Sequence, residues 1–292
     1  MKNKTNLKSA QKVLAFCALI LVVAALSFAP RQALAKNNGS EKTKLYLLSE
    51  FSTSFSSSSE NRAKNVTLAA KSVNNVVLMP SDEFSFNRVV GERSKARGYA
   101  KAAVIEKGRF VEGFGGGVCQ VSTTVYVAAV KAGLSITELH PHSVPSSYVS
   151  PSMDSTVGYD YFDLRFVNDT GGVIVIKTEV KDRVLSVKIF GEKKPLYNIV
   201  LKSNVIERII PESDEVLEKA PDKITPAFDE NGVFVLTPMR VGIKSELYAY
   251  YYQNGTLAFS KRLRYDYYRE QKRVIIKAPE IAEESAFPRG KT

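Results

Sequence analysis

The chain has 292 residues, of which 44% are hydrophobic and 24% are charged, as in ordinary globular proteins. This composition excludes a disordered, a collagen-like or a coiled-coil chain, and at about 150 residues per domain the length predicts one or two domains. The net charge is +11, but Lys2, Lys4, Lys8, Lys12 and Arg31 stand in the first 35 residues without any acid. The rest of the chain is mildly basic and has no run of Lys and Arg, so the sequence indicates no binding to nucleic acid.

The first 35 residues have the parts of an export signal. A basic stretch ends at Lys12, an uncharged and mostly apolar stretch covers 13–29, and Ala33-Leu34-Ala35 has the pattern of a signal-peptidase site. We predict cleavage after Ala35. The alternative is retention of 13–29 as a membrane anchor, although this stretch is slightly short of the about 20 residues that span a bilayer. In either case the rest of the chain works outside the cytoplasmic membrane, secreted, in the cell wall or anchored at the outer face.

Hydrophobic spacing and turn residues predict the elements of a first large region, 44–191. In chain order they are a strand at 44–48, a loop at 52–59, a helix at 61–75, a short strand at 76–79, a glycine loop at 113–117, a helix at 119–132 that ends at Gly133, and strands at 173–176 and 185–189. Helices and strands are mixed in this region.

A domain boundary is predicted near 192–196, because only strand patterns follow it. The predicted strands are at 233–236, 246–252, 256–259 and 274–277. The Asn254-Gly255 pair is typical of a tight hairpin turn, and the polar residues 279–292 are predicted to form a flexible tail. The sequence therefore predicts the α+β class: a mixed domain at 44–191 followed by a small all-β module at 197–278.

Beyond residue 35 the chain has one cysteine, Cys119, and its only two histidines, His140 and His142, follow closely. A disulfide within this part is therefore impossible, and the thiol is either buried and inert or present for its reactivity. The glycine loop followed by a helix places Cys119 at a helix N-terminus, where free N–H groups and the helix dipole stabilise a thiolate. Pro141 keeps both histidines in an extended segment, so we expect only one of them to face Cys119. The pattern predicts a cysteine nucleophile with a histidine base.

Two other interpretations of these residues stay open. A free cysteine on the apolar face of a helix often serves only for core packing. Alternatively, Cys119, His140, His142 and Asp154 have the side chains of a four-ligand zinc site, although their spacing matches no standard zinc signature. The glycine run matches no phosphate-binding loop. We expect neither a metal nor a cofactor.

Two further groups of residues have ordinary interpretations. The tyrosines at 248–252 are predicted to pack within a strand rather than to bind a sugar. Arg88, Arg93 and Arg97 are predicted to lie in a solvated loop, and attraction of a carboxylate-bearing substrate is the alternative.

Several strings in the first region resemble a known family. They are FSFN at 84–87, GGGVCQVSTTVY at 115–126, HPHS at 140–143, DSTV at 154–157 and DLRF at 163–166. Together they resemble the VanW domain, a family named after vancomycin-resistance gene clusters, over residues 44–191. The sequence departs from the family at Ser152-Met153, where many members have a glycine. The segment 197–278 is similar to the G-five module that often follows VanW.

The resemblance implies L,D-transpeptidation of peptidoglycan through Cys119. The thiolate attacks the carbonyl at the L-centre of the diamino acid in a tetrapeptide stem, D-alanine leaves, and an amine of a neighbouring stem resolves the thioester. We assign His142 as the general base, His140 as the second choice and Asp154 as the residue that orients the base.

The remaining predicted site residues would hold the substrate. The oxyanion hole is assigned to the N–H groups from Gly116 and Gly117 to Cys119, and the candidates for substrate positioning are Ser122, Thr123, Ser143 and Tyr148. The expected partners are peptidoglycan stem peptides and the anionic wall polymer. The alternatives are a non-catalytic protein that binds the cell wall and a cysteine hydrolase of stem peptides.

Overall fold

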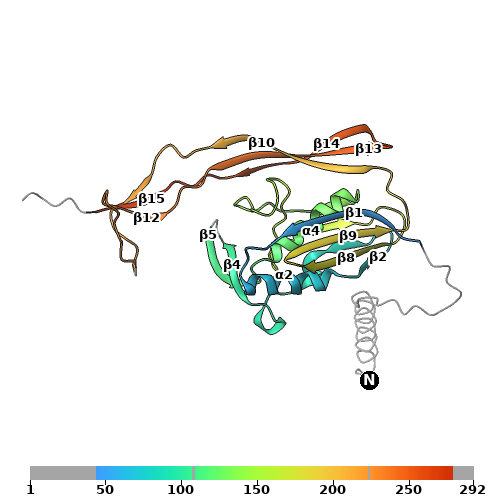
Figure 1. Ribbon diagram of the computed structural model, residues 1–292, viewed down its shortest axis with the longest axis horizontal. Helices are drawn as coiled ribbons and strands as arrows, with labels where there is room; N and C mark the ends of the chain where they lie inside the picture. Colours follow the sequence, from blue (N-terminus) through green and yellow to red (C-terminus); the bar gives the residue numbers. More distant parts are fainter. Residues whose placement is uncertain (1–43, 107–108, 223, 279–292) are drawn as a thin grey trace, which may run out of the picture. The chain divides into compact units, whose positions relative to one another are not determined.

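The structure is a computed structural model that describes residues 44–106, 109–222 and 224–278 (Figure 1). The predicted export segment at 1–35 and the predicted tail at 279–292 lie outside the described residues. The described chain belongs to one compact unit. Within it, no helix has both the length and the apolar character needed to cross a membrane.

The predicted α+β class is wrong, because the described chain is mostly β. Strands account for 44% of the described residues and helices for 16%, and every described strand pair except β11–β15 is antiparallel. Two long helices with strong apolar periodicity dominated the prediction. Short strands and half-exposed strands carry a weaker signal, since one face of such a strand does not need apolar residues.

A four-stranded sheet and two helices form the core of the first region. The sheet has the order β1-β9-β8-β2, and its strands are β1 (Tyr46–Ser54), β9 (Val184–Gly191), β8 (Ile174–Lys181) and β2 (Val76–Leu78). Helices α2 (Glu60–Val73) and α4 (Val118–Lys131) pack against this sheet (Figure 1). On β9, Leu185, Val187 and Ile189 are completely buried at alternate positions, so the period of two places one strand face in the core. The helices predicted at 61–75 and 119–132 are confirmed within two residues.

Helix α4 is buried almost all round, so its polar side chains must find partners inside the protein. The amide of Gln120 donates to the hydroxyl of Thr53 at 3.0 Å and to the carbonyl of Ser54 at 2.9 Å, both on β1. The hydroxyls of Thr53 and Thr124 lie 2.9 Å apart. These contacts fix the rotation of α4 about its axis and therefore the direction in which its first turn points.

Two smaller sheets and a short helix complete the first region. One sheet has the order β3-β7-β6 and the other is the hairpin β4-β5. Their elements are β3 (Glu83–Ser85), α3 (Phe86–Val90), a 3₁₀ turn at Lys95–Arg97, β4 (Lys101–Glu106), β5 (Arg109–Phe114), β6 (Ser135–Glu138) and β7 (Arg165–Val167).

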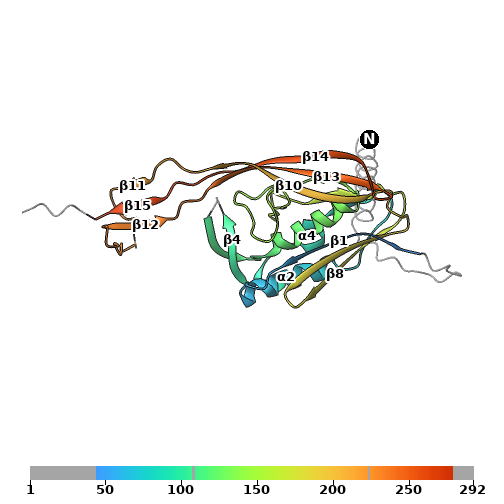
Figure 2. The ribbon, with the colours of Figure 1, turned by 45° about the horizontal axis from the view of Figure 1, so that its top comes forward.

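The chain after residue 196 forms two three-stranded sheets. The first has the order β10-β13-β14, with β10 (Asn198–Ile209), β13 (Gly242–Gln253) and β14 (Thr256–Tyr268) side by side in both views (Figures 1 and 2). The second has the order β11-β15-β12, with β11 (Glu215–Leu217), β15 (Val274–Lys277) and β12 (Val233–Thr237). The hairpin predicted at Asn254-Gly255 is confirmed, since both residues have positive φ and Gln253 pairs with Thr256.

No described strand before residue 192 pairs with a described strand after residue 196. Side chains make the connection instead. Leu247 of β13 is completely buried and belongs to the same hydrophobic cluster as Val121 and Val125 of α4, with Leu201 and Leu263 packed against that cluster. Strands β10, β13 and β14 therefore pack against the first region on the side of α4.

Candidate active site

A glycine loop carries the chain into α4 and places Cys119 as the second residue of that helix. Gly115 and Gly117 have φ values of +81° and +106°, which side chains disfavour. A Cβ atom at Gly116 would lie 2.5 Å from the carbonyl oxygen of Ala103, so the backbone approach leaves no room for a side chain. Cys119 is half-buried, and its Sγ lies 3.5 Å from the carbonyl oxygen of Val157.

His142 reaches the thiol from the extended segment that contains Pro141. Its side chain is buried, and its Nδ1 lies 2.7 Å from Oδ2 of Asp154. The same carboxylate oxygen accepts the backbone N–H of His142 at 2.7 Å, so both the ring and the main chain are fixed. The imidazole and the Cys119 thiol also lie close enough for each to shift the pKa of the other. Because Asp154 occupies Nδ1, Nε2 is the nitrogen left for Cys119, and the imidazole stands between the thiol and the carboxylate.

Asp154 is held from the side opposite to His142 by strand β14. Its side chain is 1% exposed, and the Tyr268 hydroxyl donates a hydrogen bond to its Oδ1. Arg264 stands four residues before Tyr268 on the same face of β14 and donates to the backbone carbonyl of Asp154 at 2.8 Å. The guanidinium of Arg264 is itself fixed by two 2.7 Å hydrogen bonds to Asp266. Both oxygens of the buried carboxylate thus accept hydrogen bonds from the protein, Oδ2 from His142 and Oδ1 from Tyr268.

Ser152 shows how the departure from the family pattern is accommodated. This residue is completely buried and has a φ of +64°, a conformation that glycine adopts more easily. Its N–H donates to the Tyr268 hydroxyl at 2.8 Å, and its Oγ lies 2.7 Å from Oγ of Ser245 on β13. The serine side chain thereby gains a partner that a glycine would lack.

The contacts among Cys119, His142 and Asp154 shift the pKa of each group so that its charged form is favoured. Burial alone would lower the pKa of His142, but the hydrogen bonds to Asp154 and Cys119 raise it to about 9. Burial would raise the pKa of the Cys119 thiol, but the His142 hydrogen bond and charge, together with the Arg93 charge, bring it below its usual value. Burial also opposes ionisation of Asp154, and hydrogen bonds from His142 and Tyr268 outweigh it and lower the pKa. The arrangement favours a thiolate beside an imidazolium.

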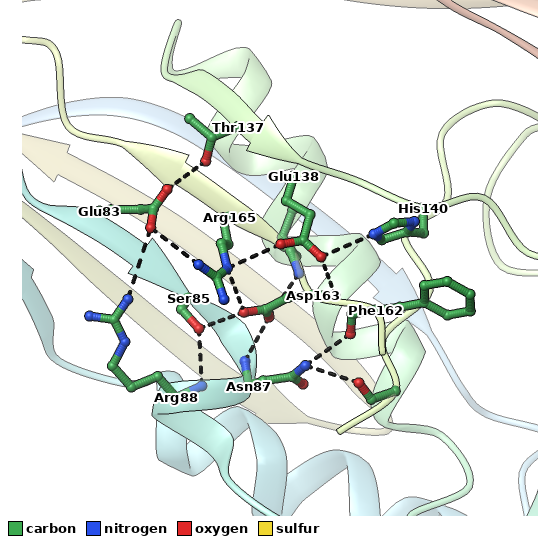
Figure 3. Close-up of polar contacts among 12 residues, drawn as sticks. Glu83, Ser85, Asn87, Arg88, Thr137, Glu138, His140, Phe162, Asp163 and Arg165 are labelled. Atoms are coloured by element: carbon green, nitrogen blue, oxygen red, sulfur yellow. Dashed lines mark hydrogen bonds and ion pairs between the residues drawn. The ribbon is translucent and has the colours of Figure 1, made fainter. Parts of the chain in front are cut away.

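His140 lies in a separate polar network (Figure 3). Its Nε2 is 3.0 Å from Oε1 of Glu138, and its ring packs on Phe162 with the centroids 4.5 Å apart. Oε1 of Glu138 also accepts the N–H of Asp163 at 2.9 Å, and Oε2 lies 3.1 Å from Nε of Arg165. The two histidines are separated only by Pro141, yet their side chains join different networks, and the structure brings His142 to the thiol.

The strings FSFN at 84–87 and DLRF at 163–166 meet in this second network. The Asp163 carboxylate accepts the Ser85 hydroxyl at 2.5 Å, the Asn87 N–H at 2.8 Å and the Nε of Arg165 at 3.1 Å (Figure 3). The Asn87 amide donates to the carbonyl of Phe162 at 2.9 Å. These residues join β3, α3 and β7, so they fix the loop that leads from Asp154 to the sheet.

The predicted substrate-positioning residues fall in three places. Ser122 and Thr123 are completely buried, and their hydroxyls bind the backbone of Ser155, the former at 2.7 Å to its carbonyl and the latter at 2.9 Å to its N–H. They attach α4 to the segment that carries Asp154. Tyr148 is half-buried near Thr123, and Ser143 is exposed.

Zinc binding by the four residues considered above finds no geometric support in the described part of the chain, where no three His, Cys, Asp or Glu side chains converge as metal ligands. His140 and Asp154 have other partners, on Glu138 and Tyr268 respectively.

Sequence reasoning missed Tyr268 and Arg264. They stand 114 and 110 residues after Asp154, and no local spacing relates them to it. One signal was available: Arg264, Asp266 and Tyr268 occupy alternate positions of a strand, so they line one face and point the same way. A polar row with an aromatic hydroxyl on a strand face is a reason to look for a buried partner.

Comparisons with known proteins agree with the VanW resemblance. Residues 61–190 match the family described as VanW like protein. The chain is 42% identical over 132 residues to the uncharacterized protein YoaR of Bacillus subtilis, and 30% identical over 147 residues to the vancomycin B-type resistance protein VanW of Enterococcus faecalis. These matches cover 45% and 48% of this chain and 44% and 54% of the relatives, so the chain spans about half the length of the curated relatives it matches.

Two solved structures similar to part of the chain are both G5 domains. They are the IgA1 protease G5 domain, with 14% identity and a TM-score of 0.17, and HP0197-G5, with 15% identity and a TM-score of 0.15. The matches cover 28% and 27% of this chain and 90% and 97% of those chains. Residues 61–190, which carry Cys119, His142 and Asp154, are thus VanW-like.

Proposed function

We propose that this protein is an exported cysteine acyltransferase of the cell wall, specifically an L,D-transpeptidase that joins peptidoglycan stem peptides. The observation that carries the proposal is the series Cys119–His142–Asp154, in which the His142 imidazole lies beside the thiol and its Nδ1 lies 2.7 Å from Oδ2 of Asp154. A thiol, an imidazole and a carboxylate in this order are the components of thiol acyl transfer. The name of the Enterococcus relative, a vancomycin resistance protein, supports peptidoglycan as the target, since vancomycin acts on the cell wall.

In the first half-reaction the Cys119 thiolate attacks the carbonyl carbon at the L-centre of the diamino acid. The C–S bond forms and the carbonyl oxygen becomes an oxyanion. As the oxyanion collapses, the C–N bond to D-alanine breaks, and the His142 imidazolium gives its proton to the leaving amine. The product is a thioester on Cys119, with His142 neutral.

In the second half-reaction an amine of a neighbouring stem attacks the thioester. Neutral His142 takes a proton from the amine, the C–S bond breaks, and the Cys119 thiolate is restored beside an imidazolium. Asp154 keeps the same ring nitrogen occupied in both steps and stabilises the imidazolium. A thioester suits this reaction because it reacts with amines faster than an oxyester does.

We assign fewer N–H groups to the oxyanion hole than the four, at residues 116–119, that the sequence suggested. The N–H of Val118 donates to the carbonyl of Gly115 at 3.0 Å, so it is already engaged. We assign the role to the N–H groups of Gly116, Gly117 and Cys119. Ser122 and Thr123 act on the geometry only through their contacts with Ser155, next to Asp154.

The proposal is tested by intact-protein mass during incubation with a disaccharide-tetrapeptide. We expect a covalent adduct that corresponds to loss of D-alanine on the native chain and no adduct on Cys119→Ala. Dimeric muropeptides then identify a transpeptidase, and free tripeptide identifies a hydrolase. Absence of the adduct, together with a slowly reacting thiol, contradicts acyl transfer and leaves a wall-binding protein.

A further inference from the structure

Two half-buried arginines flank the glycine loop that leads to Cys119. Arg62 comes from the first turn of α2, and its Cγ lies 2.9 Å from the position that a Cβ at Gly117 would take. Arg93 follows α3, and its Cβ lies 2.7 Å from the corresponding position at Gly115. Arg62 therefore packs on the loop at Gly117, two residues before Cys119, and Arg93 packs on it at Gly115, four residues before Cys119.

Each guanidinium is held by neutral groups. Nη1 of Arg62 donates to Oγ of Ser58 at 2.7 Å, and its guanidinium lies 6.0 Å from the centre of the Tyr148 ring. Such contacts orient a guanidinium without neutralising it. Burial lowers the pKa of Arg62, so its cation is partly stripped of water.

Arg93 is held in the same way. Nη2 donates to Oδ1 of Asn87 at 2.7 Å and Nη1 donates to the carbonyl of Gly91 at 3.1 Å. Its guanidinium lies 5.7 Å from the ring centre of Phe86 and 6.0 Å from that of Tyr159, whose side chain is exposed. Burial lowers the pKa of Arg93 as well, and the thiolate form of Cys119 acts against that shift.

Neither arginine has an ion-pair partner among the described residues. Asp163 influences Arg93 only at longer range, since its carboxylate is engaged by Ser85 and Asn87. Other arginines of the described chain do pair with carboxylates within 4 Å; they are Arg88, Arg165, Arg183, Arg262, Arg264 and Arg273. Two oriented, partly desolvated guanidiniums that lack an acidic partner are suited to bind an anionic ligand such as a carboxylate.

We propose that Arg62 and Arg93 form a carboxylate-binding subsite that holds the free terminal carboxylate of the acyl donor beside the Cys119 thiol. The inference rests on the proposed acyl transfer. In such a donor the carboxylate of the leaving amino acid lies two bonds from the nitrogen that departs, so a cation close to the nucleophile is within its reach. The subsite would restrict cleavage to the last residue of a stem peptide.

The test compares two alkylating reagents of similar size on the full chain. Iodoacetate carries a carboxylate and iodoacetamide is its neutral counterpart; in both, the Cys119 sulfur displaces iodide and forms a C–S bond. A change in thiol pKa affects both rates equally, so the ratio of the iodoacetate rate to the iodoacetamide rate isolates recognition of the carboxylate. We expect this ratio to fall roughly tenfold in Arg62→Gln/Arg93→Gln, as loss of a charged hydrogen-bond partner predicts.

Two variants serve as controls. Arg88→Gln removes the same charge from an exposed arginine that pairs with Glu83, and we expect the native ratio. Arg62→Lys/Arg93→Lys keeps both charges without the planar fork, and we expect an intermediate ratio, which also tests the subsite if the glutamine variant does not fold. A ratio that stays native in both double variants overturns the proposal.

The experiment separates this inference from the proposed reaction, because alkylation requires no turnover. A fallen ratio with no acyl-enzyme on the native chain supports the carboxylate subsite and contradicts the transpeptidase. An acyl-enzyme with an unchanged ratio does the reverse.

Discussion

The hydroxyl of Tyr268 donates a hydrogen bond to the carboxylate of Asp154 across 114 residues of sequence. Burial and the Asp154 charge raise the pKa of Tyr268, so the phenol stays protonated and remains a donor. The carboxylate that orients His142 is thus itself oriented by a strand from the C-terminal part of the chain. A site predicted to lie within 44–191 depends on a residue outside that range.

Tyr268→Phe is expected to lower the acyl-transfer rate about tenfold while the fold persists. The substitution removes one hydrogen bond to a buried carboxylate, which costs about 1–3 kcal/mol. Without the donor, the pKa of Asp154 rises, so the pH–rate profile shifts as well as the rate. Tyr265→Phe on the same strand is the matched control, since Tyr265 is exposed. A reduced rate with an unchanged pH profile contradicts a positioning role.

Alkylation of Cys119 is expected to proceed at pH values where an ordinary thiol reacts slowly. The pKa of this thiol is lowered because the His142 hydrogen bond and charge outweigh burial. In His142→Ala the two largest contributions that lower the thiol pKa are lost, and only the Val157 hydrogen bond and the Arg93 charge still oppose burial. The pH midpoint of the alkylation rate therefore rises above that of the native chain. The measurement is the iodoacetamide rate between pH 5 and about 10, with His140→Ala expected to behave like the native chain. Equal midpoints for native and His142→Ala chains refute the ion pair.

The buried histidine is expected to make stability depend on pH. The folded-state pKa of His142 is raised to about 9 from 6.5. A raised pKa stabilises the folded state fully below 6.5, and this contribution is lost as pH rises towards the folded-state pKa. The test uses Cys119→Ala, in which no thiol titrates. The folded-state pKa of His142 is lower in this variant than in the native chain, because Cys119 contributes to raising it, so the loss of stability is complete at a lower pH. Its urea midpoint should fall from pH 6 to pH 9, and the decrease should be absent when His142→Gln is added.

Gly117→Ala is expected to destabilise the fold by about 1–3 kcal/mol and to abolish Cys119 reactivity. A methyl group there combines a φ of +106° with approaches of 2.9 Å to Arg62 and 3.0 Å to Val66. Gly255→Ala is the control, because Gly255 also has positive φ but nothing lies within 4 Å of its added Cβ. The difference between their urea midpoints measures the steric effect alone. Equal losses in the two variants contradict close packing at the loop.

The sequence predicts the local parts of this protein better than its assembly. Helix periodicity located α2 and α4, and the Asn254-Gly255 pair located a hairpin, because both signals arise from neighbours along the chain. The fold class was wrong because the first region contains short strands, such as β3, β6 and β7, that are too short to show a clear alternation, and because β13 and β14 continue beyond the apolar stretches that predicted them. Tyr268 and Arg264 were missed for a related reason: their meeting with Asp154 depends on how β14 packs, which no spacing records.

The contact between Asp154 and Tyr268 also sets an order of events in time. A chain made from its N-terminus contains Cys119, His142 and Asp154 well before residue 268 has been added. Until β14 pairs with β13, the Asp154 carboxylate lacks the hydrogen bond from Tyr268, so the group that orients His142 is not yet held in place. Full reactivity of the thiol is therefore expected only after β14 has been made and has paired, and a product truncated before Tyr268 is expected to carry a less reactive Cys119.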